Sequence, residues 1–600
     1  MYLRITATAI LILIFVKMSN CASVSINYSL SMPEPSNHYF EVEVSFSGIT
    51  EEYIDLILPV WRPGRYFILD FPSGVQEFKA SNSNIKLDWE KTDKCTWRIE
   101  TGLRKNESDT VNVSYRVYAN EFNLRTRGLD EEHGFVNGAA VFMYSEKYRN
   151  NPLTLEVIPY AGWHVSTGLK SVSGEANKFS APDYDYLADC PLEIGTQKDF
   201  SFNVEGIEHV ICFFGEANYD IERMKSDFTK IIKRNFEFWG KIPYEKYVFI
   251  IHCTPQSGGG TEHINSNVVG VKPQDFENED SYKNFLRLIS HEFFHTWNVK
   301  QLRPKGLTPY DYTKENYTEE LWIAEGGTSY YDGLMILRTG QYSIEDFFNE
   351  ITKAVESDRM RPGNKVQSLA ESSFDAWVKF WKGNQQSYNA EVDYYRKGAD
   401  VSLILDLEIR NRSENKFSLD DIFRRMFETF PLGVRGYTNE DFKMTCSELC
   451  GGSFKEFFDD YVYGTKPIDW EKYLSFAGLD IKGSDSTVVP VLGIAISDTS
   501  GRVVINNVLP GSSAEDAGLN AEDEIIALDG VKADYVTVEK KLNELKAGEK
   551  VEITVFKQNK LKKVILKLED RKITKYHLQK ITEQSDLQKS VFESWLGLKR

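Results

Sequence analysis

Two histidines and a glutamate fall at a spacing that can hold a metal ion. His291 and His295 stand four positions apart, and Glu292 directly follows the first of them. In a helix this spacing places both imidazoles one turn apart on the same face, so both can bind one ion from one side. Zinc is the ion most often bound in this way, and it needs a third protein ligand and an open position for water. Glu292 lies beside the pair, near enough to hold that water but not placed as a third ligand.

This His-Glu-x-x-His pattern is the arrangement found in metallopeptidase helices. Apolar residues recur at helical spacing opposite the histidines, which predicts a buried helix as a rigid base for the ligands. They are Leu286, Ile289, Phe293 and Trp297. A lone histidine in an apolar helix is usually an ordinary core residue, and a chance match is the alternative to the motif. Since only nine histidines occur in 600 residues, two of them at this spacing around a glutamate favour the metal site.

The third ligand is expected in a second apolar stretch further along the chain. Glu325 stands inside that stretch, where a carboxylate is costly unless it is paired or bound to a metal. Glu319 and Glu320 are the alternatives, but they fall at the polar start of the same predicted helix, where the helix dipole favours a carboxylate. We therefore predict one zinc ion per chain, bound by His291, His295 and Glu325.

Length and charge narrow the class of protein. A chain of 600 residues is too long for one hydrophobic core, so about three domains are expected. The apolar fraction of 41% and the charged fraction of 27% are those of a globular protein. The net charge of −18 and the lack of a long basic block argue against nucleic acid as a partner.

The first 22 residues are expected to be an export signal. Arg4 supplies a positive start, and residues 7–16 form an apolar run that is too short to span a bilayer. A lipoprotein anchored at Cys21 is the alternative, although the residues before it match a lipobox poorly. We expect an exported protein, periplasmic, secreted or surface-anchored, with no transmembrane segment once the signal is removed.

The pattern of apolar residues changes along the chain. Residues 23–197 contain several segments that alternate with period two, which predicts a β-sandwich domain. No residue pattern in it points to chemistry, and we expect it to pack against the next domain and shape the mouth of the site. Residues 198–482 combine a helix over 221–239 and a buried strand over 247–252 with mainly helical patterns after the metal helix. Residues 267–271 are predicted to be an edge strand.

The C-terminal part of the sequence is predicted to form a separate small domain. Residues 483–570 alternate short strands and turns and resemble a PDZ domain, with residues 492–495 in the place of its carboxylate-binding loop. PDZ domains bind an extended peptide as an added strand, so a peptide C-terminus or strand is the expected partner here. Residues 571–600 are predicted to be a helical tail that docks on another part of the molecule. The fold class is therefore multidomain α+β.

A glycine-rich segment before the metal helix is the expected substrate site. Gly258, Gly259 and Gly260 lack side chains and let a peptide backbone approach closely. Glu262 follows them and precedes the predicted edge strand, where an extended peptide can lie. A carboxylate there would pair with the free α-amine of a peptide and set the first peptide bond beside the metal. The alternative is an ordinary turn in which Glu262 has no such role.

Several longer motifs resemble the glycyl aminopeptidase family, zinc peptidases that carry a PDZ domain. The motifs are Trp61–Tyr66, Gly258–His263, His291–Lys300, Trp322–Tyr331 and Tyr394–Ala399. The resemblance covers nearly the whole chain after the signal, although Thr261 stands where the glycine-rich loop is expected to carry Met. It implies a thermolysin-like, mainly helical catalytic domain between the β domain and the PDZ domain, related to the aminopeptidase N group.

The resemblance also implies a reaction and roles for residues. By position, Glu262 corresponds to the residue that holds the substrate amine, and Tyr395 to a tyrosine that stabilises the transition state, with Tyr394 as its rival. The implied reaction removes small N-terminal residues, glycine or alanine, from peptides, with Glu292 as the base that takes a proton from water. We therefore predict a zinc aminopeptidase of the gluzincin type. A metalloendopeptidase and a catalytically silent PDZ adaptor are the alternatives, and the presence of the base and all three ligands disfavours the adaptor.

Overall fold

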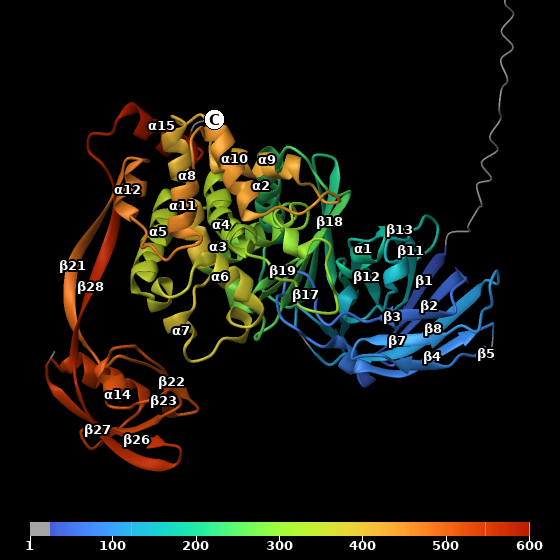
Figure 1. The fold of residues 1–600 in the computed structure, drawn as a ribbon, viewed down its shortest axis with the longest axis horizontal. Coiled ribbons are helices and arrows are strands. Elements are labelled where there is room, and N and C mark those ends of the chain that lie inside the picture. Colours follow the sequence, from blue (N-terminus) through green and yellow to red (C-terminus); the bar gives the residue numbers. More distant parts are fainter. Residues whose placement is uncertain (1–23, 84, 122, 547, 599–600) are drawn as a thin grey trace, which may run out of the picture.

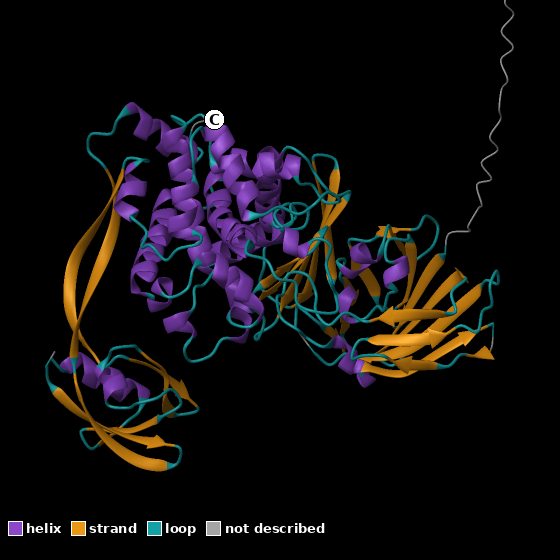
Figure 2. Ribbon diagram, in the orientation of Figure 1, coloured by secondary structure: helices purple, strands orange, loops and turns teal. Residues whose placement is uncertain are grey.

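The computed structural model describes residues 24–598 except 84, 122 and 547, and it shows three regions in a row (Figure 1). A β-rich region comes first and a mainly helical region follows. A smaller β-rich region lies at the far end of a two-stranded ribbon (Figure 2). The predicted multidomain α+β class is confirmed. The predicted export signal, with Cys21, lies outside the described residues.

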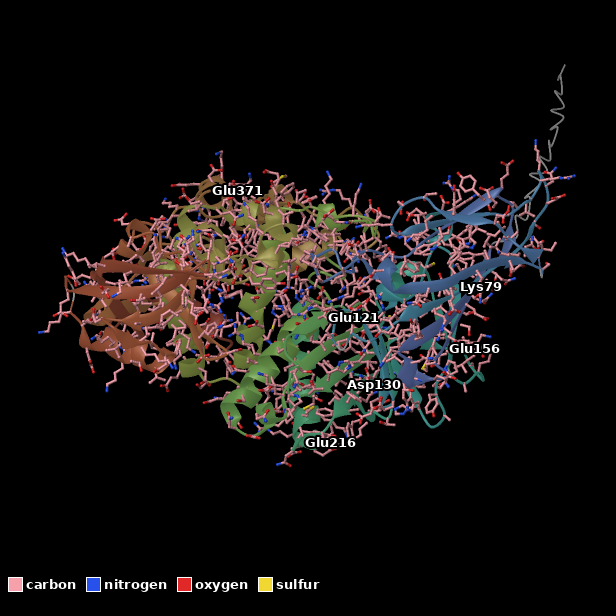
Figure 3. All side chains as sticks on the ribbon, turned by 90° about the horizontal axis from the view of Figure 1, so that it is seen from below. Lys79, Glu121, Asp130, Glu156, Glu216 and Glu371 are labelled. Carbon is pink, nitrogen blue, oxygen red and sulfur yellow. The ribbon has the colours of Figure 1, made fainter. Side chains whose placement is uncertain are left out.

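Side chains that end in nitrogen or oxygen atoms project from all three regions (Figure 3). In the part of the chain that the structure describes, no helix has both the length and the apolar character needed to cross a membrane.

The first region is built on an eight-stranded sheet. Its strands in sheet order are β13 (Lys170–Ser171), β14 (Lys178–Ala181), β11 (Leu153–Ile158), β1 (Ser25–Ser31), β2 (Tyr39–Ile49), β8 (Asp109–Tyr118), β4 (Val75–Asn82) and β5 (Ile85–Lys86). A three-stranded sheet of β3 (Tyr53–Ile57), β7 (Thr96–Glu100) and β6 (Trp89–Lys91) packs against it. The packing is direct, because Phe78 of β4 stacks on Trp97 of β7 with ring centroids 5.6 Å apart. A four-stranded sheet of β12 (His164–Thr167), β15 (Leu192–Gly195), β10 (His133–Val136) and β9 (Arg127–Leu129) completes the region, together with the short helix α1 (Tyr184–Ala188).

The second region begins with a five-stranded sheet. Its order is β16 (Lys198–Val204), β17 (Ile207–Gly215), β18 (Lys246–Cys253), β20 (Ser266–Val271) and β19 (Gly260–Glu262). The prediction that residues 267–271 form the edge strand was wrong. The glycine-rich segment folds back antiparallel on β20, with Gly260 opposite Val269, so β19 is the edge and β20 lies inside the sheet. The edge strand therefore carries Glu262 itself.

Helices cover the rest of this region. The principal ones are α2 (Ile221–Trp239), α3 (Glu279–Phe294), α4 (Gly327–Arg338), α5 (Ile344–Met360) and α8 (Arg396–Arg412). The others are α6 (Leu369–Phe374), α7 (Ser387–Ala390), α9 (Leu419–Thr429), α10 (Asn439–Cys450), α11 (Lys455–Tyr461) and α12 (Trp470–Ser475). The side chain of Asn278 caps α3 by accepting a hydrogen bond from the Ser281 N–H at 2.9 Å. The predicted apolar side of the metal helix is buried, with none of its four residues more than 2% exposed.

The third region stands apart on its ribbon. Strand β21 (Leu479–Val491) leads out and pairs antiparallel with β28 (Glu569–Lys580), which leads back. Between them lies a sheet of β22 (Ile494–Thr499), β23 (Arg502–Val508), β24 (Glu524–Leu528), β26 (Lys550–Lys557) and β27 (Lys560–Lys567), with β25 (Val531–Lys532) and the helices α13 (Ser513–Asp516) and α14 (Tyr535–Glu544). This unit has an apolar core of its own around Ile505, Val551 and Ile553. It touches the helical region where the Asn389 side chain donates to the Val508 carbonyl at 2.8 Å.

The prediction of a helical tail over residues 571–600 was wrong for its first third. Residues up to Lys580 belong to β28, because their backbone groups pair with β21, a strand about ninety residues earlier in the chain. A partner so distant in sequence leaves no local signal in the tail. Helix α15 (Asp586–Trp595) is the part that is helical. The predicted limits of the PDZ unit, after residues 482 and 570, fall inside the ribbon.

Helix α15 docks back on the helical region. Trp595 is fully buried, and its indole N–H donates to the Tyr330 hydroxyl at 2.8 Å. The Trp595 carbonyl accepts two hydrogen bonds from the guanidinium of Arg338, at 3.1 Å and 2.9 Å. Helix α15 thus completes the hydrophobic core of the helical region.

We predict that Trp595→Ala lowers the free energy of unfolding of the helical region by about 3–5 kcal/mol, because it leaves a cavity in a packed core. Leu598→Ala is the matched control, since Leu598 is 50% exposed. That change should stay within about 0.5 kcal/mol, as for most surface positions. Denaturant unfolding followed by tryptophan fluorescence and circular dichroism measures both. Equal stability of Trp595→Ala and the wild type would mean that α15 is not part of the core.

Candidate active site

Three neighbouring segments bring the predicted metal ligands together. His291 lies in the last turn of α3, His295 directly follows that helix, and Glu325 lies in a π-helical turn, Trp322–Gly326, that precedes α4. The two Nε2 atoms of the histidines are 3.1 Å apart. Glu325 Oε2 is 3.2 Å from His295 Nε2 and 3.9 Å from His291 Nε2. Wide helical turns of this kind occur often at functional sites.

The far side of each histidine ring is held by an acceptor. His291 Nδ1 lies 3.2 Å from Asp332 Oδ2, and His295 Nδ1 lies 2.7 Å from the Asn298 carbonyl oxygen. These acceptors take the Nδ1 hydrogens and leave both Nε2 lone pairs facing the same point. A tetrahedral zinc ion with bonds of about 2.0–2.1 Å holds its ligands roughly 3.3 Å apart. The three donor atoms therefore fit zinc.

A second group of possible ligands shares one member with the first. Atoms of Glu262, Glu292 and His295 also lie within 4.8 Å of one another. However, buried Lys300 places its ammonium 3.8 Å from Glu262 Oε1, and Arg62 lies close enough to lower the pKa of that carboxyl. A metal dication beside Glu262 would face these two cations, so the set with two imidazoles is the better metal site.

The electrostatics of the site favour a cation at that point. Burial raises the pKa of Glu292 to about 7, and the neighbouring carboxylates of Glu262 and Glu325 add to this rise. Burial alone would lower the pKa of His295, but Glu325 outweighs it and raises that pKa to about 9. Three buried carboxylates thus surround the imidazoles and make the local potential strongly negative.

Glu262 is held as a buried anion on the edge strand. Burial acts to raise its pKa, but Lys300, then His295 and Arg62, outweigh that effect and lower it. Lys300 is itself fully buried and donates to Asp189 Oδ1 at 2.9 Å. Glu262 Oε1 is a buried atom without a hydrogen-bond partner among the described residues. Glu262 also lines the cavity that contains the histidines, so its carboxylate can meet a ligand there.

Two glycines make room for these carboxylates. A side chain on Gly260 would collide with the carboxylate of Glu292, and a side chain on Gly64 would collide with that of Glu262. Of the four predicted substrate residues, only Gly260 and Glu262 line the cavity that contains the histidines. Gly258 lines a neighbouring cavity, and Gly259, which lies near Arg125, lines neither of these two cavities.

The structure separates the two tyrosines that were alternatives. Tyr395 is half-buried, lines the cavity of about 380 Å³ at the metal ligands, and its ring lies nearly parallel to His291 with centroids 6.4 Å apart. Tyr394 is fully buried, and its hydroxyl accepts a hydrogen bond from the Trp381 indole at 3.0 Å. Gly398 and Gly326 allow this arrangement, because a side chain on either would collide with the backbone of the other helix turn.

The first region contributes to the site more directly than its sequence indicated. The loop Trp61–Tyr66 enters the helical region, where Trp61 donates to the Asp311 carbonyl at 2.7 Å. Tyr66 donates to Glu325 Oε1 at 3.3 Å, and Arg62 is buried beside Glu262. The sequence feature that could have revealed this role is an arginine and a tyrosine within an apolar, proline-rich run. Glu262 lies 200 residues after Arg62, and Glu325 lies 259 residues after Tyr66, so spacing alone does not reveal these partners.

The sequence matches three family models in the order of the three regions. They are the Peptidase M61 N-terminal domain over residues 27–196, the M61 glycyl aminopeptidase over residues 284–401, and the PDZ domain over residues 490–568. A comparison with curated proteins found no match.

Solved structures include one that resembles the whole chain. An aminopeptidase N family protein from Idiomarina loihiensis has a TM-score of 0.88 at 28% sequence identity, covering 95% of this chain and 100% of that chain. An M1 zinc metallopeptidase from Deinococcus radiodurans has a TM-score of 0.49 at 13% identity, covering 74% of this chain and 94% of that chain. The three family matches and the first of these structures lead to one conclusion: the chain belongs to the M61 glycyl aminopeptidase family of peptidases.

Proposed function

We propose that this protein is a zinc aminopeptidase that removes a small residue, glycine or alanine, from the N-terminus of peptides. The observation that carries the proposal is Glu262, a buried carboxylate on the edge strand with one oxygen free of hydrogen bonds. A peptide laid along β19 would bring its charged α-amine to this carboxylate, which lines the cavity. The first peptide bond would then lie beside the histidines. The name of the matching family model supports the preference for glycine.

A metal ion at this site would supply the Lewis acid that the side chains cannot provide. A zinc ion held by His291, His295 and Glu325 would act as a Lewis acid on a carbonyl oxygen and would lower the pKa of a water molecule. Glu292 is the base, because burial raises its pKa to about 7 and so suits it to take a proton near neutral pH and pass it to the leaving amine. Asp332 keeps the His291 ring oriented through Nδ1.

Tyr395 is placed to stabilise the transition state. It lines the cavity next to His291, so its hydroxyl can donate to the oxyanion that forms at the scissile carbonyl. Burial, and then the charge of Glu325, hold the pKa of Tyr395 well above its usual range. The hydroxyl therefore keeps its hydrogen at neutral pH.

The alternatives make different demands on the site. A buried anion at the end of the cleft would not help an endopeptidase to bind its substrate, because the peptide chain of that substrate carries no charge at this point. A silent adaptor has no use for a base and three metal donors gathered around one point. The PDZ domain can still bind a peptide of its own, because β22 is the edge of its sheet and offers free backbone groups. We also propose, from the first 22 residues, that the protein is exported, with Cys21 as an alternative lipid anchor.

The purified protein should hold about one zinc ion per chain, and His295→Ala should lose it. Glu292→Gln should keep the zinc and lose about 10²- to 10⁴-fold in kcat, because the base is gone while the ligands remain. Elemental analysis and hydrolysis of glycyl peptides measure the two effects. Full activity of Glu292→Gln would contradict the assigned base, and loss of its zinc would make Glu292 a ligand.

Tyr395→Phe should lower kcat by about 10²-fold or more with little change in KM, because the lost hydrogen bond acts mainly in the transition state. Tyr394→Phe is the matched control, and its effect should be much smaller, since that hydroxyl bonds to Trp381 behind the cavity wall. Steady-state kinetics on one glycyl substrate compare the two variants. The reverse ranking would transfer the role to Tyr394.

Acetylation of the substrate amine should abolish cleavage of glycyl and alanyl reporter peptides, since an amide cannot form the ion pair with Glu262. Glu262→Gln should raise KM and lower kcat on free-amine peptides, because the bond is then misplaced as well as weakly held. Product release measured by chromatography tests both. Equal cleavage of free and acetylated peptides would favour the endopeptidase.

A further inference from the structure

A second cavity adjoins the site between the helices α4, α5 and α8. Its volume is about 370 Å³, and Arg287, Asp332 and Tyr395 line both cavities. Its walls include the apolar side chains of Phe347, Ile351 and Leu403. It is a pocket of the size and character that holds a small ligand or one side chain of a larger ligand.

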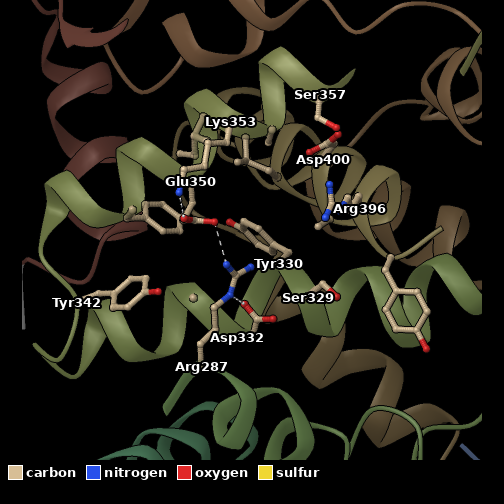
Figure 4. Close-up of a pocket in the computed structure, with 17 residues that line it drawn as sticks. Arg287, Ser329, Tyr330, Asp332, Tyr342, Glu350, Lys353, Ser357, Arg396 and Asp400 are labelled. Carbon is tan, nitrogen blue, oxygen red and sulfur yellow. Dashed lines mark hydrogen bonds and ion pairs between the residues drawn. The ribbon is translucent and has the colours of Figure 1, made fainter. Parts of the chain in front are cut away.

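One carboxylate in this cavity has no partner. Asp400 is 8% exposed, and among the described residues no hydrogen bond or ion pair reaches its carboxyl group. Burial raises the pKa of Asp400 well above its usual range, and the nearby carboxylate of Asp358 raises it further. Lys397 lowers this pKa, but its effect is smaller. Figure 4 shows Asp400 with Ser357 and Arg396 at one end of the cavity. A buried carboxyl without a partner is costly unless a ligand supplies one.

The other charges of the cavity are already paired. Arg287 donates to Asp332 at 2.6 Å and to Glu350 at 3.0 Å, as the dashed lines in Figure 4 mark. Lys353 donates to the second oxygen of Glu350 at 3.0 Å. The Arg396 side chain lies near Asp393, at 3.8 Å, and is 77% exposed. Asp400 is therefore the buried ionisable group of this cavity that remains without a partner among the described residues, and a cationic ligand would stabilise its charged form.

The cavity lies on the leaving side of the proposed scissile bond. Glu262 sits beside His295, whereas Arg287 lies two turns earlier on α3, which is about 12 Å along the helix axis. The first cavity extends from Glu262 past His291 to Arg287 and Tyr395, so a peptide with its amine at Glu262 can follow it to where the second cavity begins. Asp400 lies five residues after Tyr395, about 7 Å further along α8. A lysine side chain spans roughly this distance.

We propose that the second cavity takes a basic side chain of the residue that follows the scissile bond, with Asp400 as its ionic partner. This inference rests on the proposed aminopeptidase function. The apolar walls hold the methylene groups of a lysine or arginine stem, and the charged end reaches the carboxylate. A neutral side chain of the same length fills the same space and leaves Asp400 unmatched. The preferred substrate is then a peptide with a small first residue and a basic second residue.

The test compares Gly-Lys-amide with Gly-norleucine-amide, which has the same carbon chain without the amine. The wild type should show a kcat/KM at least about ten times higher for the lysine peptide, in keeping with the strength of a charge-assisted contact in a buried pocket. Asp400→Asn, which keeps the shape of the side chain, should bring this ratio to about one. Arg396→Gln is the matched control from the same helix, and it should raise the ratio because it removes a competing cation. Thermal melting checks that both variants are folded.

A binding experiment separates this inference from the proposed function. Calorimetry on the Glu292→Gln variant should show about tenfold tighter binding of the lysine peptide than of the norleucine peptide. Adding Asp400→Asn should remove that difference. If neither peptide is hydrolysed by the wild type, the proposed function fails, and the calorimetric difference still decides for or against the cavity. A ratio near one in the wild type, or an unchanged ratio in Asp400→Asn, would overturn the inference.

Discussion

The buried carboxylates around the two histidines set the main constraint on this fold. Glu262, Glu292 and Glu325 are each at most 5% exposed and lie around the same imidazoles. Such a group of anions is stable only where cations or hydrogen-bond donors balance it. The chain meets this need with Lys300 and Arg62 beside Glu262, and with a point between the imidazoles that suits a metal ion. Much of the surrounding structure exists to hold these charges in place.

This constraint explains why the β-rich region and the helical region form one unit. Tyr66 and Arg62 reach the site from the first region, and the hydrophobic core runs through both regions without a break. The interface between them is therefore part of the site itself. The PDZ unit has its own core and lies on a ribbon, so it is physically separate from the chemistry.

Local spacing was enough to predict which residues the fold brings together as candidate ligands and base. His291 and Glu292 follow from one helical motif, and Glu325 follows from the cost of a carboxylate in an apolar stretch. The remaining features depend on contacts between segments that are far apart in sequence. Lys300 and Asp189 are 111 residues apart, and the partner of β28 lies about ninety residues before it. The cavity at Asp400 is likewise invisible in sequence, because residues of four separate helices line it.

Because α15 docks on the helical region, that region can complete its core only after the C-terminal part of the chain has been synthesised. Arg338 and Trp595 are 257 residues apart, and the PDZ unit is made between them. A ribosome that has finished the catalytic residues has therefore not yet released the helix that closes their core. In the nascent chain, the apolar side chains that α15 covers therefore stay uncovered until that helix has been made. Premature termination anywhere in the PDZ unit would then yield a chain with every catalytic residue and an incomplete core, a natural substrate for quality-control proteases.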